Sequence, residues 1–308
     1  MLESGCFWAV DMAKPVRDKT ETQVIRRRSF GGNYLLLGGI LLRGILPAAL
    51  MTHPLQKPLQ SSLLASSGFS HGFFSRLGGV SRAPFDSMNA AASVGDDPAN
   101  VRTNVGRAAA ALGVTAERLY YLSQVHGVVA VTLDGAAHPD KVVELRGDIT
   151  LSGTPGIACG VRSADCGTLL IGDRVTGAVC AVHSGWRGTV ANAAQAGVSA
   201  LRTLIGDDGD LVAAIGPLIE RCCFEVGDDV AGELGGCSSV GRDAIDRSRE
   251  KAHVDLRAIL EAQLVDAGVD RAAIDQVRGC TVCDRERFFS FRRDGKQSGR
   301  LLSAIVAR

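Results

Sequence analysis

The chain has 308 residues, of which 46% are hydrophobic and 22% charged, and its formal net charge is +1. This composition is typical of a globular protein, and the charge excludes a general electrostatic attraction to nucleic acid or to an anionic membrane. We therefore expect neither nucleic acid nor a membrane as a partner, and any anion site must be local.

The first fifty residues differ from the rest of the chain. Residues 24–51 contain a basic run and then an apolar stretch that Arg43 interrupts, and "RRSF" loosely resembles a twin-arginine export signal. One interpretation is export or anchoring, and the other is a dispensable leader ahead of a natural translation start at Met51. The second is preferred because no clean cleavage site follows. We predict a leader or disordered extension over 1–60 and a catalytic domain over 61–308.

The segment after residue 68 begins the predicted fold. "GFSHGFFSRLGGVS" is typical of a strand followed by a glycine-rich loop. Residues 95–114 predict a helix, with Asp97 as its N-cap and Pro98 at its first position. Strand-like segments then follow one another without helices at 120–127, 128–135, 148–153, 156–164, 167–173 and 175–185. They cannot all be βαβ units, so a mixed or antiparallel sheet is predicted.

The C-terminal third predicts more helix. Helices are expected at about 188–204 and 251–267, a strand at 210–219, a short helix within 224–234 and a final strand at 300–307. With one compact unit, these elements predict an α/β fold of α+β character, a layered α/β sandwich with mixed β-sheets in a single domain. We expect a monomer.

The nine cysteines fit no regular disulfide framework, and an odd number cannot pair completely within one molecule. Reduced cysteines predict a cytoplasmic protein. Cys280 and Cys283 form a C-x-x-C pair, and Cys222 and Cys223 are adjacent, but no second pair lies at zinc-finger spacing. A redox or structural-zinc role is one interpretation of the C-x-x-C pair. The preferred interpretation is small buried side chains.

Three residues with zinc-ligand chemistry stand at the ends of predicted strands: His126, Cys166 and His183. Two imidazoles and one thiolate leave a fourth position open, which is the pattern of catalytic zinc, whose bound water has a pKa near 7. Each of these residues, taken singly, is also typical of a structural role. Gly185, Trp186 and Arg187 follow His183 at the start of a predicted helix, where backbone N–H groups gather around ligands.

Several blocks, in order and spacing, resemble the bacterial YfiH (laccase-domain) family: "HGFFSRLGGVS", "SVGDDPANV", "SQVHG", "GDITLSGTPGIACGVRSADCGTLLIGD", "AVHSGWRGT", "AIGPLIERCCFEVG" and "CTVCDRERFFSFRRDG". The resemblance spans residues 69–308. It implies a zinc-dependent purine nucleoside phosphorylase that acts on adenosine, inosine, guanosine and methylthioadenosine and that also deaminates adenosine. Its partners would be a nucleoside and inorganic phosphate.

Carried over by motif, the family's zinc ligands fall on the same two histidines and cysteine. The arginine of the "FFSR" block falls on Arg76, and the Trp-Arg pair falls on Trp186 and Arg187. We interpret both arginines as phosphate or substrate clamps, because a guanidinium binds phosphate through paired hydrogen bonds. The alternative is a solvated or helix-capping arginine. The chain departs from the family after Cys166, where Gly167 replaces the usual proline.

Deamination of a purine also needs a carboxylate that moves a proton. Asp165, Glu225 and Asp148 are the candidates, and each is equally an ordinary acceptor of backbone N–H groups. The "RRDG" motif at 292–295 is interpreted either as a source of substrate contacts or as a turn.

Other functional classes were weighed against this one. In a cysteine hydrolase, Cys166 would be the nucleophile and His183 or His126 the base, acting on an amide such as a peptidoglycan precursor. A laccase requires more imidazoles than the six histidines supply, so zinc is expected rather than copper. A zinc-stabilised binding module would need a fourth protein ligand.

Overall fold

The computed structural model describes residues 55–206 and 208–308, which belong to one compact unit running from Thr52 to Arg308. The export-like segment and the alternative start at Met51 lie outside the described residues. Within the described ranges, no helix combines the length and the apolar character needed to cross a bilayer. The first described helix, α1 (Ser62–Ser66), is capped by Ser61, and Leu59 just before it pairs with Phe73.

Two mixed β-sheets form the centre of the fold. The six-stranded sheet contains, in spatial order, β12 (Ile274–Gln276), β8 (Leu211–Ile215), β6 (Gly167–Asp173), β7 (Val179–Ser184), β4 (Ile149–Ser152) and β3 (Ala130–Thr132). The four-stranded sheet contains β1 (His71–Phe73), β13 (Leu301–Val306), β5 (Ala158–Ser163) and β2 (Leu119–Tyr120). Only the pairs β3–β4, β8–β12 and β2–β5 are parallel among these described strands. The predicted mixed sheets are confirmed.

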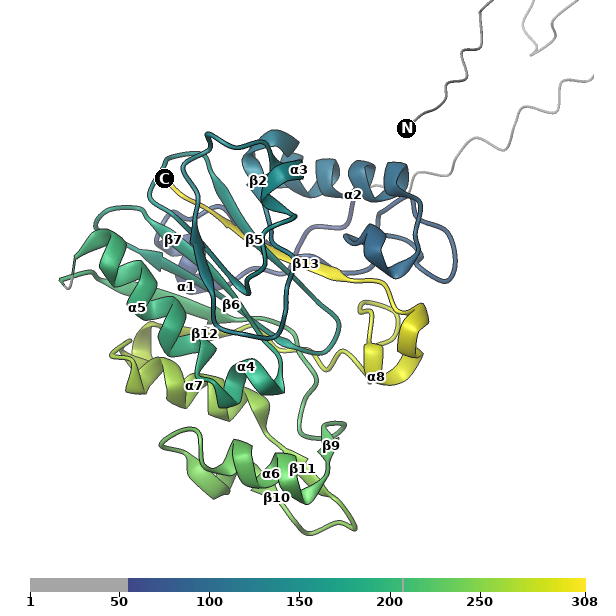
Figure 1. Ribbon diagram of the computed structural model, residues 1–308, viewed down its shortest axis with the longest axis vertical. Helices are drawn as coiled ribbons and strands as arrows, with labels where there is room; N and C mark the ends of the chain where they lie inside the picture. Colours follow the sequence, from purple (N-terminus) through teal and green to yellow (C-terminus); the bar gives the residue numbers. More distant parts are fainter. Residues whose placement is uncertain (1–54, 207) are drawn as a thin grey trace, which may run out of the picture. The chain divides into compact units, whose positions relative to one another are not determined.

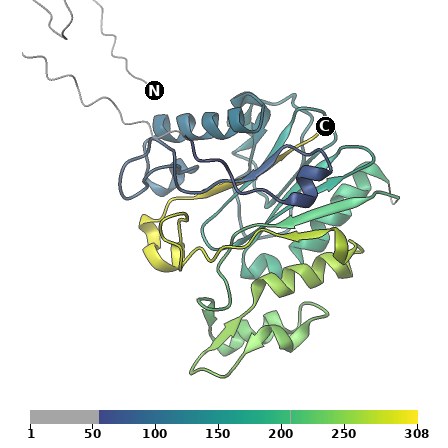
Figure 2. The same cartoon turned by 180° about the vertical axis from the view of Figure 1, so that it is seen from behind.

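The sheets and three helices make four layers. Apolar side chains of both sheets interlock between them, among them Val161, Leu170 and Ile305. Helices α5 (Ala193–Ile205) and α7 (Leu256–Asp266) cover the other face of the six-stranded sheet, and α2 (Pro98–Ala111) covers the outer face of the four-stranded sheet (Figures 1 and 2). Strands buried on both faces explain the nearly continuous apolar runs in the sequence.

The remaining described elements lie around this sandwich. A small antiparallel sheet of β10 (Ile245–Asp246), β11 (Ala252–Val254) and β9 (Glu225–Val226) packs with α6 (Asp228–Gly235). The short helices are α3 (Pro139–Val142), α4 (Trp186–Val190) and α8 (Phe291–Asp294). The 3₁₀ turns are η1 (Ala92–Val94), η2 (Ala116–Arg118), η3 (Gly241–Ala244), η4 (Arg271–Ala273) and η5 (Gly295–Gln297).

Capping residues explain where the helix predictions succeed and fail. The Asp97 side chain accepts a hydrogen bond from the N–H of Ala99 at 2.8 Å, and α2 starts at Pro98 as predicted. The single helix predicted over 188–204 is two, because Asn192 adopts a left-handed conformation and caps α5. The helix predicted from 251 begins only after its cap, Asp255, since the preceding residues pair as β11.

Two predicted strands are shorter than expected. The strand predicted over 120–127 is only β2, and the rest of that segment, including His126, is a loop. The strand predicted from Val175 starts at Val179, after a turn in which Asp173 accepts hydrogen bonds from Thr176. The first loop carries His126, whereas the turn before Val179 joins β6 to β7 at the end of these strands opposite Gly167 and Ser184.

Candidate functional site

Three neighbouring strands bring the predicted metal ligands together. In the antiparallel pair β6–β7, Gly167 lies opposite Ser184, so Cys166 comes next to the residues that follow His183. On the other side of β7, Ile149 pairs with Val182, and the N–H of His183 donates to the carbonyl of Asp148 at 2.8 Å. The loop that carries His126 precedes β3, which runs parallel to β4.

Asp148 fixes both histidines from behind. Its carboxylate accepts hydrogen bonds from the backbone N–H groups of His126 at 2.9 Å and Gly127 at 2.7 Å, and it lies 2.8 Å from Nδ1 of His183. Burial raises the pKa of Asp148, but these hydrogen bonds outweigh it and hold the pKa below its usual value. Asp148 is therefore buried and positions both histidine segments, and its role as a proton carrier stays a prediction. A carboxylate on Nδ1 leaves Nε2 of His183 to face a ligand.

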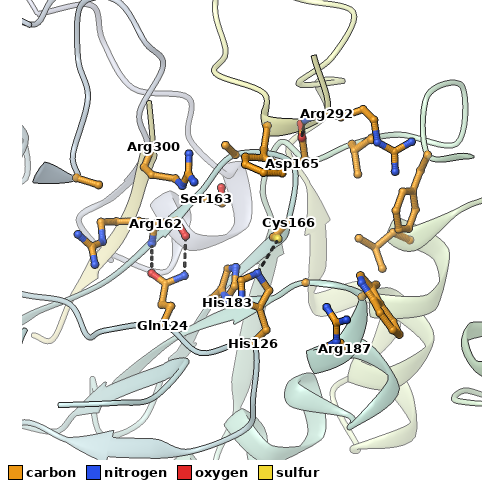
Figure 3. A pocket seen from close by; sticks show the side chains of 18 of the residues that line it. Gln124, His126, Arg162, Ser163, Asp165, Cys166, His183, Arg187, Arg292 and Arg300 are labelled. Carbon is orange, nitrogen blue, oxygen red and sulfur yellow. Dashed lines mark hydrogen bonds between the residues drawn. The ribbon is translucent and has the colours of Figure 1, made fainter. Parts of the chain in front are cut away.

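The side chains of the three candidate ligands lie close together at the ends of these strands (Figure 3). One ligand atom from each of His126, Cys166 and His183 lies within 4.8 Å of the others. Sγ of Cys166 is 3.9 Å from Nε2 of His126, and the two imidazole rings meet edge to face with centroids 5.0 Å apart. Gly185 borders them, because a Cβ there would lie 2.7 Å from Cδ2 of His126 and 3.0 Å from Sγ of Cys166.

Two residues of the site have left-handed backbone conformations that non-glycine residues seldom adopt. His126 has φ 61° and Asp165 has φ 93°. Asp165 is held by Thr281, whose hydroxyl donates to Oδ1 at 2.6 Å, and by the N–H of Arg292, which donates to Oδ2 at 2.6 Å. Strain retained by surrounding contacts is typical of functional sites. Both oxygens of Asp165 are thus used as structural acceptors.

Cys166 and His183 form a coupled acid–base pair. Burial raises the pKa of the Cys166 thiol, but the imidazoles of His183 and His126 outweigh it and lower the pKa to about 6. Burial lowers the pKa of His183, whereas Cys166 and Asp148 raise it to about 9. Without a metal, the site therefore holds a thiolate beside an imidazolium at neutral pH. A metal ion must displace the proton of His183 to bind there.

The pKa values of Cys166 and His183 predict how the rate of Cys166 alkylation by iodoacetamide depends on pH in metal-free protein. The thiolate is the reactive form, so the rate should be constant above about pH 7 and fall as the pH drops through the lowered pKa. His183→Ala should shift this fall to higher pH, because it removes the charge that stabilises the thiolate. Peptide mapping of the alkylated protein measures the rate. A rate at Cys166 that still rises above about pH 8 would contradict the pair.

A cavity of about 560 Å³ opens in front of the three residues. Its wall contains the aromatic side chains Trp186, Phe224 and Phe291, and its described lining also includes four arginines: Arg162, Arg187, Arg292 and Arg300. Arg300 lies on one side of Cys166, while Arg187 and Arg292 lie on the other (Figure 3). A volume of this size accommodates a small organic ligand, and the lining offers it both flat apolar surfaces and positive charge.

The two arginines nearest the four-stranded sheet are partly dehydrated. Burial lowers the pKa of Arg162, and the charge of Arg300 lowers it further. The Arg162 guanidinium donates to the carbonyl of Leu122 at 3.0 Å, and the Gln124 side chain pairs with both backbone polar groups of Arg162 at 2.7 Å (Figure 3). Arg300 donates to the carbonyls of Ser298 and Gly299. Two like charges at one wall favour an anion beside them.

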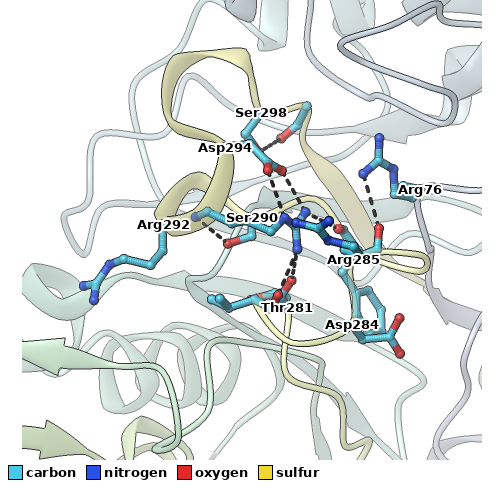
Figure 4. Close-up of polar contacts among 12 residues, drawn as sticks. Arg76, Thr281, Asp284, Arg285, Ser290, Arg292, Asp294 and Ser298 are labelled. Carbon is cyan, nitrogen blue, oxygen red and sulfur yellow. Dashed lines mark hydrogen bonds and ion pairs between the residues drawn. The ribbon is translucent and has the colours of Figure 1, made fainter.

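The structure does not bring every predicted site residue into the cavity. Arg76 lies outside the lining: its guanidinium donates to the carbonyls of Asp86 at 2.7 Å and Arg285 at 3.3 Å and stacks over Phe289 (Figure 4). The role of Arg76 as a phosphate clamp stays a prediction, and in this structure its donors join two loops. Glu225 is also outside the lining, since its carboxylate pairs with Lys251 at 2.8 Å.

The remaining predicted residues are closer to their expected places. Trp186 and Arg187 line the cavity, with the Arg187 guanidinium 4.3 Å from the centre of the Trp186 ring. The first three residues of the "RRDG" motif belong to the helical turn α8, and Gly295 follows it as the C-cap. Arg292 lines the cavity, whereas the Arg293 guanidinium donates to the carbonyls of Thr281 and Val282.

Gly167, where the chain departs from the family pattern, is buried at the first position of β6. A Cβ at this position would lie 2.4 Å from Cδ1 of Leu260 on α7. Leu260 therefore occupies the space that a larger residue would fill. Packing against α7, in place of a proline ring, supports the strand next to Cys166.

Arg162, Arg300, Phe224 and Phe291 line the cavity but were not singled out from the sequence. A charged residue inside the apolar run of β5 was the available signal for Arg162, because an arginine in a buried strand needs a special environment. Arg300 directly precedes the final strand and carried a similar but weaker signal. The two phenylalanines carried none, since they are as typical of the core as of a cavity wall.

Comparison with known proteins places this geometry in context. The family model described as multi-copper polyphenol oxidoreductase laccase matches residues 70–308. A purine nucleoside phosphorylase of Deinococcus radiodurans is 36% identical over 235 residues, which cover 76% of this chain and 88% of that protein. A protein named adenosine deaminase RL5, from an unknown prokaryotic organism, is 35% identical over 234 residues, which cover 74% and 89%. The crystal structure of the Bacillus licheniformis hypothetical protein YfiH matches with a TM-score of 0.72 at 28% identity and covers 78% and 93%.

Proposed function

Because the chain belongs to the family described as multi-copper polyphenol oxidoreductase laccase, with the YfiH resemblance confirmed, we propose that it is a zinc-dependent purine nucleoside phosphorylase that also deaminates adenosine. One observation carries the proposal. A single cavity contains a His-Cys-His group with metal-ligand chemistry, three aromatic side chains and four arginines. The names of the relatives support nucleosides as substrates.

The residues present fit a zinc ion. His126, Cys166 and His183 would hold it, and Asp148 orients both histidines. Gly185 leaves the space beside His126 and Cys166 open, which any larger residue would fill. Zinc bound by three protein ligands supplies a Lewis acid with a position for a further ligand.

The donor set favours zinc over a set of laccase copper centres. The other described histidines are engaged elsewhere: His71 is buried beside Ser61, His138 caps α3, and His253 lies in the small sheet. Among the described residues that line the cavity there is no methionine to act as the axial ligand common in blue-copper sites. One His₂Cys group open to a substrate-sized cavity is the arrangement of a catalytic zinc site.

The aromatic wall suits a purine base. Trp186, Phe224 and Phe291 line the cavity, and Phe291 is half exposed. Stacking of a base on an aromatic ring contributes about 1–3 kcal/mol and tolerates different bases. The wall therefore supports acceptance of adenine, hypoxanthine and guanine nucleosides without discrimination by stacking alone.

Arg300 is the arginine best placed for inorganic phosphate. Cys166 and Asp165 raise its pKa against the lowering effect of burial, so its guanidinium lies near the candidate metal ligands. The Ser163 hydroxyl shares this wall of the cavity (Figure 3). A phosphate held by Arg300 and Ser163 would stand beside the ribose of a base that stacks on the opposite wall. Phosphorolysis requires such a placement, in which the phosphate can reach the glycosidic carbon.

Substitution of Arg300 should separate phosphate binding from folding. Arg300→Gln is expected to raise the KM for phosphate about 10- to 100-fold, because it removes charged hydrogen bonds to the anion. Arg76→Ala should leave that KM unchanged and lower the free energy of unfolding by about 1–3 kcal/mol, since Arg76 joins two loops. Initial rates against phosphate concentration and urea unfolding measure both effects. A raised KM for phosphate in Arg76→Ala, together with an unchanged KM in Arg300→Gln, would instead favour Arg76 as the phosphate-binding residue.

For deamination, Asp165 is the carboxylate among the described residues that line the cavity. Its two oxygens accept hydrogen bonds from Thr281 and from the N–H of Arg292, so proton transfer requires one of these bonds to open. Glu225 and Asp148, the other two candidates, lie outside the cavity lining. We propose Asp165 as the group that moves the proton.

The experiment is product analysis of the purified, zinc-loaded protein. Inosine should yield hypoxanthine and ribose 1-phosphate with phosphate and neither without it, whereas adenosine should yield inosine in phosphate-free buffer. Chromatography of bases and sugars measures the products. Release of free ribose, or no turnover of any purine nucleoside, would contradict the proposal.

A cysteine hydrolase stays the second candidate, on one observation. Cys166 has a lowered pKa and an adjacent imidazole, which together make a reactive thiolate. A hydrolase of this type would keep its activity after chelation and would be inhibited by alkylation of Cys166. A zinc-dependent phosphorylase should lose activity on chelation and regain it when zinc is restored.

A further inference from the structure

Four cysteines form a second cluster outside the cavity lining. The sulfur atoms of Cys222, Cys223, Cys280 and Cys283 all lie within 4.8 Å of one another. Cys222 is 3.7 Å from Cys223, 3.6 Å from Cys280 and 3.7 Å from Cys283, and Cys223 is 3.3 Å from Cys283. The sequence-based interpretation of small buried side chains is wrong here, because Cys222 and Cys283 are exposed and the other two are half-buried.

These separations match a tetrahedral metal ion. With four Zn–S bonds of about 2.3 Å, the sulfurs of a regular tetrahedron lie about 3.8 Å apart. A disulfide needs a sulfur separation of about 2.05 Å, and none of the measured pairs approaches it. Four thiols gathered around one point are the donor set of a closed structural zinc site.

The surroundings suit a cluster of thiolates. Two arginine side chains bring positive charge to the edge of the four-cysteine cluster. Arg249 donates to the carbonyl of Cys222 at 3.5 Å, and Arg292 donates to the carbonyl of Cys223 at 3.3 Å. Outer hydrogen bonds of this kind orient metal ligands and stabilise their charge.

We propose that Cys222, Cys223, Cys280 and Cys283 bind a structural zinc ion, distinct from the candidate catalytic ion. Binding replaces the thiol protons with zinc and releases them to solvent. The two cysteine pairs come from the loop after β8 and the loop after β12, which meet in a parallel bridge between Leu218 and Cys280.

Such an ion would stabilise one wall of the cavity. Ile219 and Phe224, on either side of the first cysteine pair, line the cavity, and Thr281, between the second pair, donates to Asp165. A clamp between the two loops therefore fixes the aromatic wall and the support of Asp165. Loss of the ion at the four cysteines should therefore lower the stability of the protein and weaken substrate binding, and it should have less effect on the metal content of the His-Cys-His group.

The test counts zinc in four full-length proteins by elemental analysis: the unmodified protein and three variants. Cys280→Ser combined with Cys283→Ser should contain one zinc ion fewer than the unmodified protein and unfold at a lower temperature. The control, Cys237→Ser, removes a half-buried thiol that bonds to the carbonyl of Leu234 and should lose no zinc. Cys166→Ala should lose a different ion, so failure of the catalytic site would not mimic failure of this one.

A second measurement uses the unmodified protein and needs no folded variant. Exposed Cys222 and Cys283 should resist alkylation while zinc is bound and react after chelation. Three results would overturn the proposal: equal zinc content in the double variant, rapid alkylation without chelation, or disulfide-linked peptides with the mass loss of two hydrogens per bond. Iron in place of zinc would also contradict it.

Discussion

Cys166→Ala is expected to lower kcat/KM for phosphorolysis about 10³-fold or more and to remove one zinc ion per chain. Cys166 is the thiolate of the candidate metal group and lies within 4.8 Å of both imidazole donors. When residues act as a unit, removal of one member abolishes most of the catalysis of the whole. The zinc content and the rate should fall together, since the thiolate serves catalysis by holding the ion.

Cys237→Ala is the matched control, because Cys237 is a half-buried thiol outside the cavity lining. It should leave kcat/KM within about twofold of the unmodified protein, as expected of a substitution away from the reacting groups. A Cys166→Ala protein that folds, keeps its zinc and still cleaves inosine at the original rate would disprove the ligand role of Cys166.

Gly185→Ala should nearly abolish activity through one methyl group. An added Cβ would lie 2.7 Å from Cδ2 of His126 and 3.0 Å from Sγ of Cys166, which is closer than van der Waals contact permits. The backbone at Gly185 has φ −74°, so alanine meets no conformational strain and the effect is purely steric. Displacement of His126 and Cys166 should weaken the zinc affinity by about 10- to 100-fold or more, which is the range seen when a residue that orients a metal ligand is lost.

Gly188→Ala provides the control three residues away. A Cβ at Gly188 would make ordinary contacts, the nearest at 3.5 Å to the carbonyl oxygen of Gly127. This variant should retain zinc and activity. Zinc titration with a competing chelator and initial rates distinguish the two variants. Equal zinc affinity in both would mean that the metal does not lie beside Gly185.

The sequence predicted those parts of the fold that local chemistry determines. Asp97 and Pro98 mark the start of α2, and the uninterrupted strands imply a mixed sheet. The break at Asn192 was missed, because asparagine within a helical pattern signals a left-handed cap only weakly. The early part of the predicted 251–267 helix is instead β11, which pairs with β10 just before it and with the more distant β9.

The residues of the candidate site were likewise only partly predictable from the sequence. The ligand trio was predictable, since histidine and cysteine at strand ends carry a recognisable chemistry. The placement of arginines was not: Arg76 and Arg300 have the same side chain, and only the tertiary contacts direct one to neighbouring loops and the other to the cavity. The four-cysteine cluster depends on two loops meeting at Leu218 and Cys280, a long-range contact that sequence spacing alone does not show.

The most direct measurement of the proposed activity is the fate of inosine followed by phosphorus NMR with the zinc-loaded protein. Ribose 1-phosphate should appear in step with hypoxanthine, both should stop when phosphate is omitted, and chelation should abolish both until zinc is restored. Equal hypoxanthine release without phosphate, or full activity after zinc removal, would contradict a zinc-dependent phosphorylase.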